Sequence, residues 1–194
     1  MTRTRLEAFS DGVIAIIITI MVLELHAPHG TGLADLWHLW PKGLSYLISF
    51  VIVAIYWNNH HHLLHASERV DGLVLWANIH LLFWLSLIPF TTAWMGEQAA
   101  AEVPVAVYAV VLLLSAVAYT LLTRALLRLH AEDSRLARAL GADWKGKASL
   151  LAYLAAIPLA FVSRWAALAI IAGVALVWFV PDRRIERALE RHAG

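Results

Sequence analysis

Long apolar stretches separated by short polar segments make up most of the chain. A helix that crosses a bilayer needs about 20 mostly apolar residues, and this length divides the chain into candidate spans. We expect an all-α integral membrane protein with one domain, residues 1–194, which forms a six-transmembrane-helix subunit. The expected spans are residues 6–25, 43–64, 72–94, 104–126, 148–162 and 165–180.

The last apolar stretch, residues 148–180, is too long for a single span and is interrupted by Ser163 and Arg164. This pattern predicts a tight hairpin of two short helices. The segment 129–147 mixes both charge signs, and we expect a cytoplasmic amphipathic loop or short helix there.

The basic residues predict the orientation of the chain. With six spans, only Lys42 and Arg164, of the 15 lysines and arginines, fall on the side opposite the termini. Cytoplasmic loops carry an excess of Lys and Arg, so both termini are expected in the cytoplasm, and the protein in the inner (plasma) membrane. A single span over 148–180 would place the arginine-rich tail outside, so the charge pattern also favours the hairpin.

Composition narrows the classes of function. Hydrophobic residues make up 61% and charged residues 15% of the chain, whereas soluble domains average about 45–50% and 25%. The net charge of +1 predicts no broad basic surface for nucleic acid. Cysteine is absent, which excludes disulfides and thiolate metal sites. No sequence motif of a hydrolase or a nucleotide-binding enzyme stands out, so neither an enzyme nor a cofactor is expected.

Polar residues occur at similar depth inside three successive spans. Asp11, His61 and Asn78 each lie about five to eight residues from the inner end of a span, or roughly 7–12 Å below the surface. Such a layer could be an ion or proton site, because polar groups in a membrane are costly. It could also be a structural clamp in which Arg5 or a histidine pairs with Asp11, and we favour the clamp because an unpaired buried charge costs more.

The His60-His61-His62 run raises the alternative of a metal site. Adjacent residues on a helix point about 100° apart, so the three rings cannot converge on one ion. His61 and His65 could share a face, but a zinc site would need further ligands such as Asp11. A metal is therefore not expected, and an enzyme with a histidine metal site is the weaker alternative.

One face of the first span is a stripe of branched apolar residues. Ile16, Thr19, Ile20 and Leu23 follow the i, i+3, i+4, i+7 spacing and point roughly away from Asp11. This stripe could face lipid or pack in the bundle. If copies of the span met on an axis, its rings of Ile and Leu would form a hydrophobic constriction that gates by dewetting.

Acidic residues occupy the predicted outer loops. These residues are Asp35, Glu97 and Glu102, and Glu24 lies near the outer end of the first span. Acidic mouths raise the local concentration of cations, but ordinary solvated loop charges would give the same pattern.

The opening of the chain, Arg5-x-x-x-Phe9-Ser10-Asp11 followed by GVIAIIITIMVLEL, resembles the signature of the transmembrane protein 175 family of potassium channels, in its bacterial single-repeat branch. Trp57-x-x-His60-His61 and the segment from Asn78 to Pro89-Phe90 resemble the second and third spans of that family.

The resemblance implies a homotetramer whose first helix lines the pore. It implies that Ile16, then Ile20 and Leu23, form the gate and that Thr19 matches a position linked to cation preference. Arg5, Phe9, Ser10 and Asp11, with His61 and Asn78 as partners, are then expected to be a structural polar network. The sequence leaves open which histidine meets Arg5 and Asp11.

We therefore expect a weakly selective, potassium-permeable channel for monovalent cations in a lipid bilayer. The alternative in another class is a secondary transporter or proton-coupled carrier that uses Asp11 and the histidines.

Overall fold

The computed structural model describes residues 2–67, 69–129 and 144–179, and all regular structure in these ranges is helical. The helices are α1 Arg3–Leu23, α2 Leu33–Trp37, α3 Trp40–His65, α4 Gly72–Ser86, α5 Ile88–Glu97, α6 Glu102–Leu129, α8 Trp144–Val162 and α9 Arg164–Phe179. Most of the expected loop 129–147 lies outside the described residues.

Five segments of the described chain are long and apolar enough to cross a membrane: α1, α3, α4 with α5, α6 and α8. The chain is thus an all-helical membrane protein. The sixth predicted span corresponds to α9, which at 16 residues would measure about 24 Å and is shorter than a typical span. α8 and α9 are separate helices that meet at Ser163.

The third predicted span is broken, and proline explains the break. α4 ends at Ser86 and α5 begins at Ile88, with Pro89 at its start. Proline has no N–H to donate to the carbonyl of Leu85, and its ring clashes with the preceding turn, so the helix is interrupted at Leu87. A prediction from hydropathy alone gave one uninterrupted helix over 72–94 and missed this interruption.

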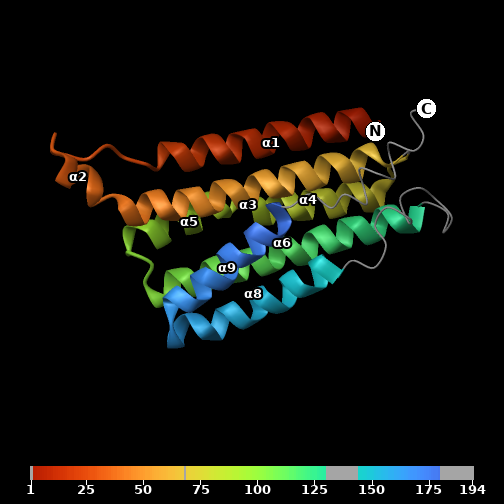
Figure 1. Cartoon of the computed structure of the whole chain (residues 1–194). Helices are drawn as coiled ribbons and strands as arrows, with labels where there is room; N and C mark the ends of the chain where they lie inside the picture. The colour runs from red at the N-terminus through yellow and green to blue at the C-terminus, as the bar shows by residue number, and fades with distance from the viewer. Residues whose placement is uncertain (1, 68, 130–143, 180–194) are drawn as a thin grey trace, which may run out of the picture.

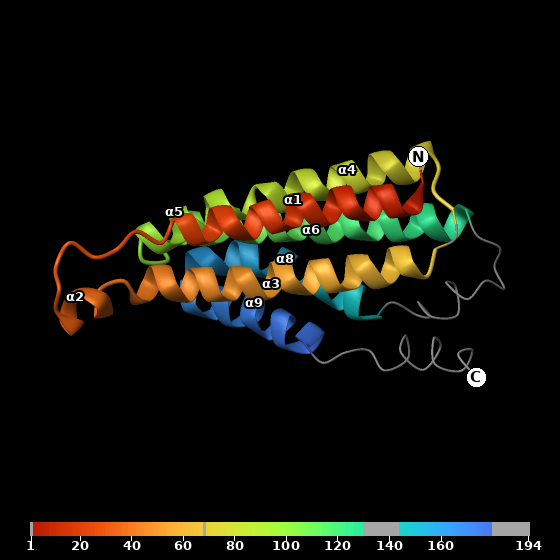
Figure 2. The ribbon, with the colours of Figure 1, turned by 90° about the horizontal axis from the view of Figure 1, so that it is seen from above.

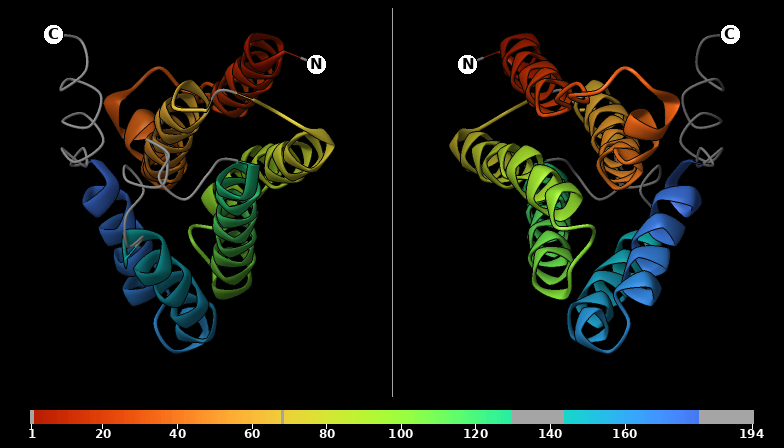
Figure 3. Two further views of the ribbon diagram at one scale, coloured as in Figure 1. Left: turned by 90° about the vertical axis from the view of Figure 1, so that its right-hand side faces the viewer. Right: turned by 90° about the vertical axis from the view of Figure 1, so that its left-hand side faces the viewer.

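α1 lies at one edge of the bundle. It packs mainly on α3, α4 and α5, whereas α6 lies deeper, against α4, α5 and α8. Seen along the helices, α1 and the α8–α9 pair occupy opposite ends of the bundle (Figures 1 and 3). The start of α1 and the end of α3 lie at the same end of the molecule, which we call the inner end (Figure 2).

A buried hydroxyl cluster joins three helices in the outer half of the bundle. Ser49 of α3 and Tyr108 of α6 share a hydrogen bond of 2.8 Å, and Thr92 of α5 donates to Ser49 over 2.7 Å. Hydrogen bonds between helices stabilise membrane bundles, where apolar side chains gain little by leaving lipid. α1 takes no part in this cluster.

Gly96 marks a close approach of α5 to α3. A Cβ at this position would lie 3.0 Å from Lys42 Cα, and the Lys42 ammonium lies 3.4 Å from the Glu97 carboxylate. Apart from its chain neighbours and its own helical backbone, no described residue lies within 4 Å of the Cβ position of Gly173 in α9.

This contrast predicts opposite effects of the same substitution. Gly173→Ala should stabilise the protein by about 0.5–1 kcal/mol, because alanine is the better helix former. Gly96→Ala should destabilise it by about 1–3 kcal/mol, because the Lys42 backbone must move. The thermal midpoint of purified protein in detergent checks both, and shifts in the same direction would contradict the described packing.

Candidate pore helix and its polar contacts

α1 has one buried face and one exposed face. Leu6, Ser10, Ile14, Ile17 and Met21 are buried against the rest of the bundle. The opposite face carries Ile16, Thr19, Ile20 and Leu23, and their exposure is 59% for Ile16, 43% for Ile20 and 69% for Leu23. The stripe that the i, i+3, i+4 spacing predicted is therefore exposed, and no described residue of the same chain covers it.

The exposed stripe extends to the inner end of α1. Phe9 is 53% exposed, and Arg5 is also exposed. At 3.6 residues per turn, Arg5, Phe9 and Ile16 fall on nearly the same side of the helix. Thr19 donates its hydroxyl to the carbonyl of Ala15 over 2.8 Å, so this polar side chain is satisfied by its own helix.

A groove runs beside the outer half of the stripe. It has a volume of about 770 Å³ and lies between α1, which contributes Ile16 and Ile20, and α5, which contributes Phe90 and Trp94. The rings of Phe90 and Trp94 stack with their centroids 6.1 Å apart. The outer half of α1 is therefore incompletely covered on two sides.

Three buried residues tie the inner half of α1 to α3 and α4. Asn78 of α4 donates to Ser10 Oγ over 2.9 Å, and His60 Nε2 lies 2.7 Å from Asn78 Oδ1. Ser10 donates in turn to the carbonyl of Leu6 over 2.9 Å. Since the amide oxygen of Asn78 can only accept, the proton of His60 must be on Nε2.

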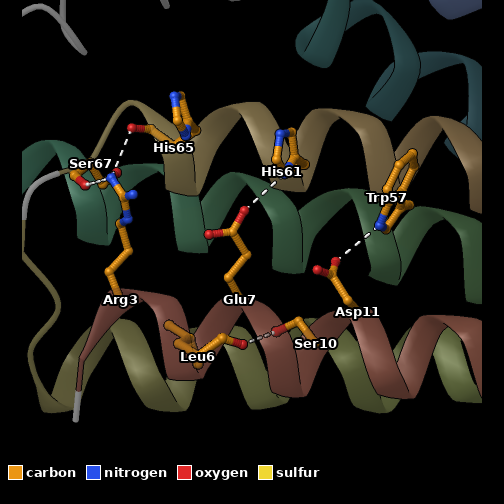
Figure 4. Close-up of polar contacts among 9 residues, drawn as sticks. All are labelled: Arg3, Leu6, Glu7, Ser10, Asp11, Trp57, His61, His65 and Ser67. Carbon is orange, nitrogen blue, oxygen red and sulfur yellow. Dashed lines mark hydrogen bonds and ion pairs between the residues drawn. The ribbon is translucent and has the colours of Figure 1, made fainter.

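A second set of polar contacts follows the α1–α3 seam (Figure 4). Asp11 accepts a hydrogen bond of 2.9 Å from Trp57 Nε1, and Glu7 Oε1 lies 2.8 Å from His61 Nδ1. Arg3 donates to the backbone carbonyls of His65 and Ser67 over 3.1 and 3.2 Å. Steps of four residues along α1 thus match steps of four along the antiparallel α3.

The structure brings together Ser10 and Asn78 from the predicted network, and it places Asp11 at the neighbouring seam. The histidine that meets Asn78 is His60, whereas His61 meets Glu7 and not Asp11. Arg5 makes no hydrogen bond or ion pair with the described part of the chain, and Arg3 holds the end of the seam instead.

Four residues of these contacts were not assigned to the predicted polar network. They are Arg3, Glu7, Trp57 and His60. The signal that could have found them is the shared spacing of four, since positions 3, 7 and 11 of one helix match 65, 61 and 57 of an antiparallel neighbour.

The described residues form no group of three or more His, Asp or Glu side chains that could hold a metal ion. His61 and His65 lie on one face, but their rings are stacked with centroids 5.9 Å apart. His80 of α4 accepts a hydrogen bond of 2.9 Å from Trp84 on its own helix. Nothing in this part of the chain supports a zinc centre.

The predicted acidic residues of the outer end have different surroundings. Glu97 is paired with Lys42, and Asp35 accepts from the backbone N–H of Gly32 over 3.0 Å at the start of α2. Glu24 follows the last residue of α1 and is exposed beside the groove.

Comparison with known proteins gives a consistent result. The family model described as the endosomal/lysosomal potassium channel TMEM175 matches residues 5–89. A potassium channel from Chryseobacterium sp. (strain P1-3) is 48% identical over 192 residues, which cover 99% of this chain and 100% of that protein. A potassium channel from Chamaesiphon minutus is 34% identical over 175 residues, or 83% of this chain and 85% of that protein.

The fold is shared as well. The crystal structure of a lysosomal potassium-selective channel TMEM175 homolog from Chamaesiphon minutus matches with a TM-score of 0.78 at 31% identity. The match covers 92% of this chain and 96% of that chain. Whole-length similarity at these levels, together with the family match over residues 5–89, shows that the chain belongs to the TMEM175 family, which is a family of channels and not of enzymes.

Proposed function

We propose that the protein is a potassium-permeable, weakly selective cation channel in which four copies surround a pore lined by α1. The observation that carries the proposal is the uncovered stripe of α1. A face with Ile16 59% and Leu23 69% exposed runs along a helix whose other face is fixed by hydrogen bonds to α3 and α4. The names of the bacterial relatives as potassium channels support the same activity.

The polar contacts support a structural role for the inner half of α1. Ser10 and Asp11 point into the bundle toward Asn78 and Trp57, on the side opposite Ile16. Ions moving along the stripe would not meet these groups. We assign Ser10, Asp11 and Asn78, with His60 in place of the expected His61, to the clamp that orients the pore helix. Arg5 and Phe9 would then lie at the inner mouth of the pore.

The gate would consist of rings of Ile16, Ile20 and Leu23, spaced by about one turn each. A narrow pore lined by hydrocarbon excludes water unless it widens, and an ion cannot cross without water or polar ligands. Thr19 offers the one hydroxyl beside these rings, which suits a modest preference among monovalent cations.

The groove between α1 and α5 supports assembly through this face. Its occupant in our proposal is α1 of a neighbouring copy, because the groove includes Ile16 and Ile20 and is lined mainly by apolar and aromatic side chains. Glu24, exposed at the end of α1, would then contribute a ring of carboxylates that concentrates cations at the outer mouth. The basic residues near the termini favour a cytoplasmic inner end in the plasma membrane.

The reversal potential in planar bilayers under a potassium/sodium gradient tests the activity. A channel of the proposed kind gives a reversal potential that is shifted toward the potassium equilibrium potential. The shift is smaller than that of a channel that admits potassium alone. Bilayers that receive detergent without protein are the control. Sealed vesicles with no passive flux would overturn the channel and favour a carrier that uses Asp11 and the seam histidines.

A further inference from the structure

His60 and His61 are neighbours in α3 but have opposite surroundings. Adjacent residues on a helix point about 100° apart, so one ring enters the contact with α4 while the other follows the α1–α3 seam. His60 is fully buried, whereas the side chain of His61 is 43% exposed. Histidine is the side chain whose charge ordinarily changes between pH 5 and 8.

His60 is arranged to be neutral. Its Nε2–H donates to Asn78, and its Nδ1 is buried with no partner among the described residues. A proton on Nδ1 would place a second N–H and a positive charge where no acceptor lies. The charged and titratable groups that act on this ring are Asp11 and Glu7 of α1 and its neighbour His61. None of them accepts a hydrogen bond from Nδ1, so protonation disfavours the arrangement of α1, α3 and α4.

His61 is arranged to be stabilised by a proton. Its Nδ1 lies 2.8 Å from Glu7 Oε1, and among the described residues no other carboxylate is paired with it. The rings of Trp57, His62 and His65 surround it on α3 at centroid distances of 6.2, 5.6 and 5.9 Å. A proton on the ring turns a hydrogen bond between a neutral and a charged group into an ion pair, which strengthens it. Its partial exposure limits the repulsion from the other histidines.

We propose that these two adjacent histidines make the strength of the attachment of α1 to α3 depend on pH at the inner end. The attachment is strongest at an intermediate pH. It weakens towards high pH, which we call the alkaline limb, and towards low pH, which we call the acidic limb. A neutral His61 ring gives Glu7 a hydrogen bond in place of an ion pair, so the attachment loosens on the alkaline side. As pH falls far enough to protonate His60, the buried contact with Asn78 is disrupted and the attachment loosens again. Where α1 lines a pore, which rests on the proposed function, ion flux follows the same two limbs.

The thermal midpoint of the purified protein in detergent, measured from pH 5 to 8.5, tests the proposal without any channel assay. The wild type should show a maximum. His61→Gln can still donate to Glu7 but cannot be charged, so it should lose the decline on the alkaline side and retain the decline on the acidic side. His65→Gln is the matched control, because it removes a neighbouring histidine that does not bond Glu7, and it should retain both limbs. An unchanged alkaline limb in His61→Gln would overturn the assignment.

The acidic limb needs a readout that does not require a His60 variant, since such a variant could fail to fold. Nitrogen NMR of histidine-labelled protein reports the protonation of each ring. His60 should stay neutral with its proton on Nε2 until the folded state itself is lost, because its Nδ1 has no acceptor among the described residues. A His60 ring that becomes charged with no loss of stability would overturn this limb.

Currents at varied inner pH separate this inference from the proposed function. Hydrogen bonds to charged groups contribute about 1 kcal/mol more stability than neutral ones, so ion flux should change by roughly three- to tenfold along the alkaline limb. In Glu7→Gln the flux should no longer vary with pH along this limb. A protein with the expected stability profile but no passive flux would overturn the channel and leave the pH dependence intact. Potassium currents with a flat wild-type profile would overturn the pH dependence alone.

Discussion

Asn78→Leu is expected to lower the stability of the folded protein by about 1–3 kcal/mol, because the buried N–H of His60 loses its acceptor. Leucine is close to asparagine in size, so the substitution removes the hydrogen bonds to His60 and Ser10 without leaving a large cavity. The fully buried site gives water no access to replace them. The thermal midpoint and the fraction of monodisperse protein after extraction in detergent measure the effect.

Asn59→Leu is the matched control for this prediction. Asn59 is half-buried on α3, and its side chain donates only to the carbonyl of Ile55 in its own helix over 2.9 Å. The loss of folding stability in Asn59→Leu should be well under half of the loss in Asn78→Leu. Equal losses for the two variants would show that the buried chain through Asn78 does not hold α1.

Ile16→Asn is expected to increase ion flux through the closed channel by roughly ten- to hundredfold. A buried isoleucine side chain contributes about 1.5–3 kcal/mol of apolar transfer free energy, and an amide at the constriction removes that barrier to water. Four copies around one axis would place four amides in the same ring. Flux of potassium into proteoliposomes at zero voltage, together with single-channel open probability, measures the change.

Ile79→Asn is the control for the gate. Ile79 is 46% exposed, comparable to Ile16, but it lies on α4 and outside the α1 stripe. Its replacement should leave the flux near that of the wild type. Unchanged currents in Ile16→Asn would exclude Ile16 from the gate, and equal increases in both variants would indicate leakage from damaged packing.

Periodicity predicted the two faces of α1 well because it depends only on helix geometry. Once residues 6–25 are helical, Ile16, Ile20 and Leu23 must share a side, and Ser10 must lie away from it. The prediction was less good for helix limits. α1 begins at Arg3, because the side chain of Arg3 is held by the end of α3, and a prediction from hydropathy takes no account of such a contact.

The choice between His60 and His61 could not be made from depth. Both lie in the same layer, and the two rings differ by about 100° around the helix axis. Which ring meets Asn78 depends on how α3 is rotated against α4, and tertiary packing decides that rotation. The same limit applies to Arg3 and Arg5, since only the packing of α1 on α3 makes position 3 the one that reaches the carbonyls of His65 and Ser67.

The one-sided attachment of α1 has a mechanical consequence. In the described residues, all its hydrogen bonds to other helices involve side chains from Arg3 to Asp11, and farther out only apolar side chains such as Ile17 and Met21 hold it. The helix therefore resembles a lever with its fulcrum near Asp11. Ile16 lies about 7.5 Å from that point and Leu23 about 18 Å. A small tilt would displace Leu23 more than twice as far as Ile16, so in the proposed tetramer the two rings would widen unequally.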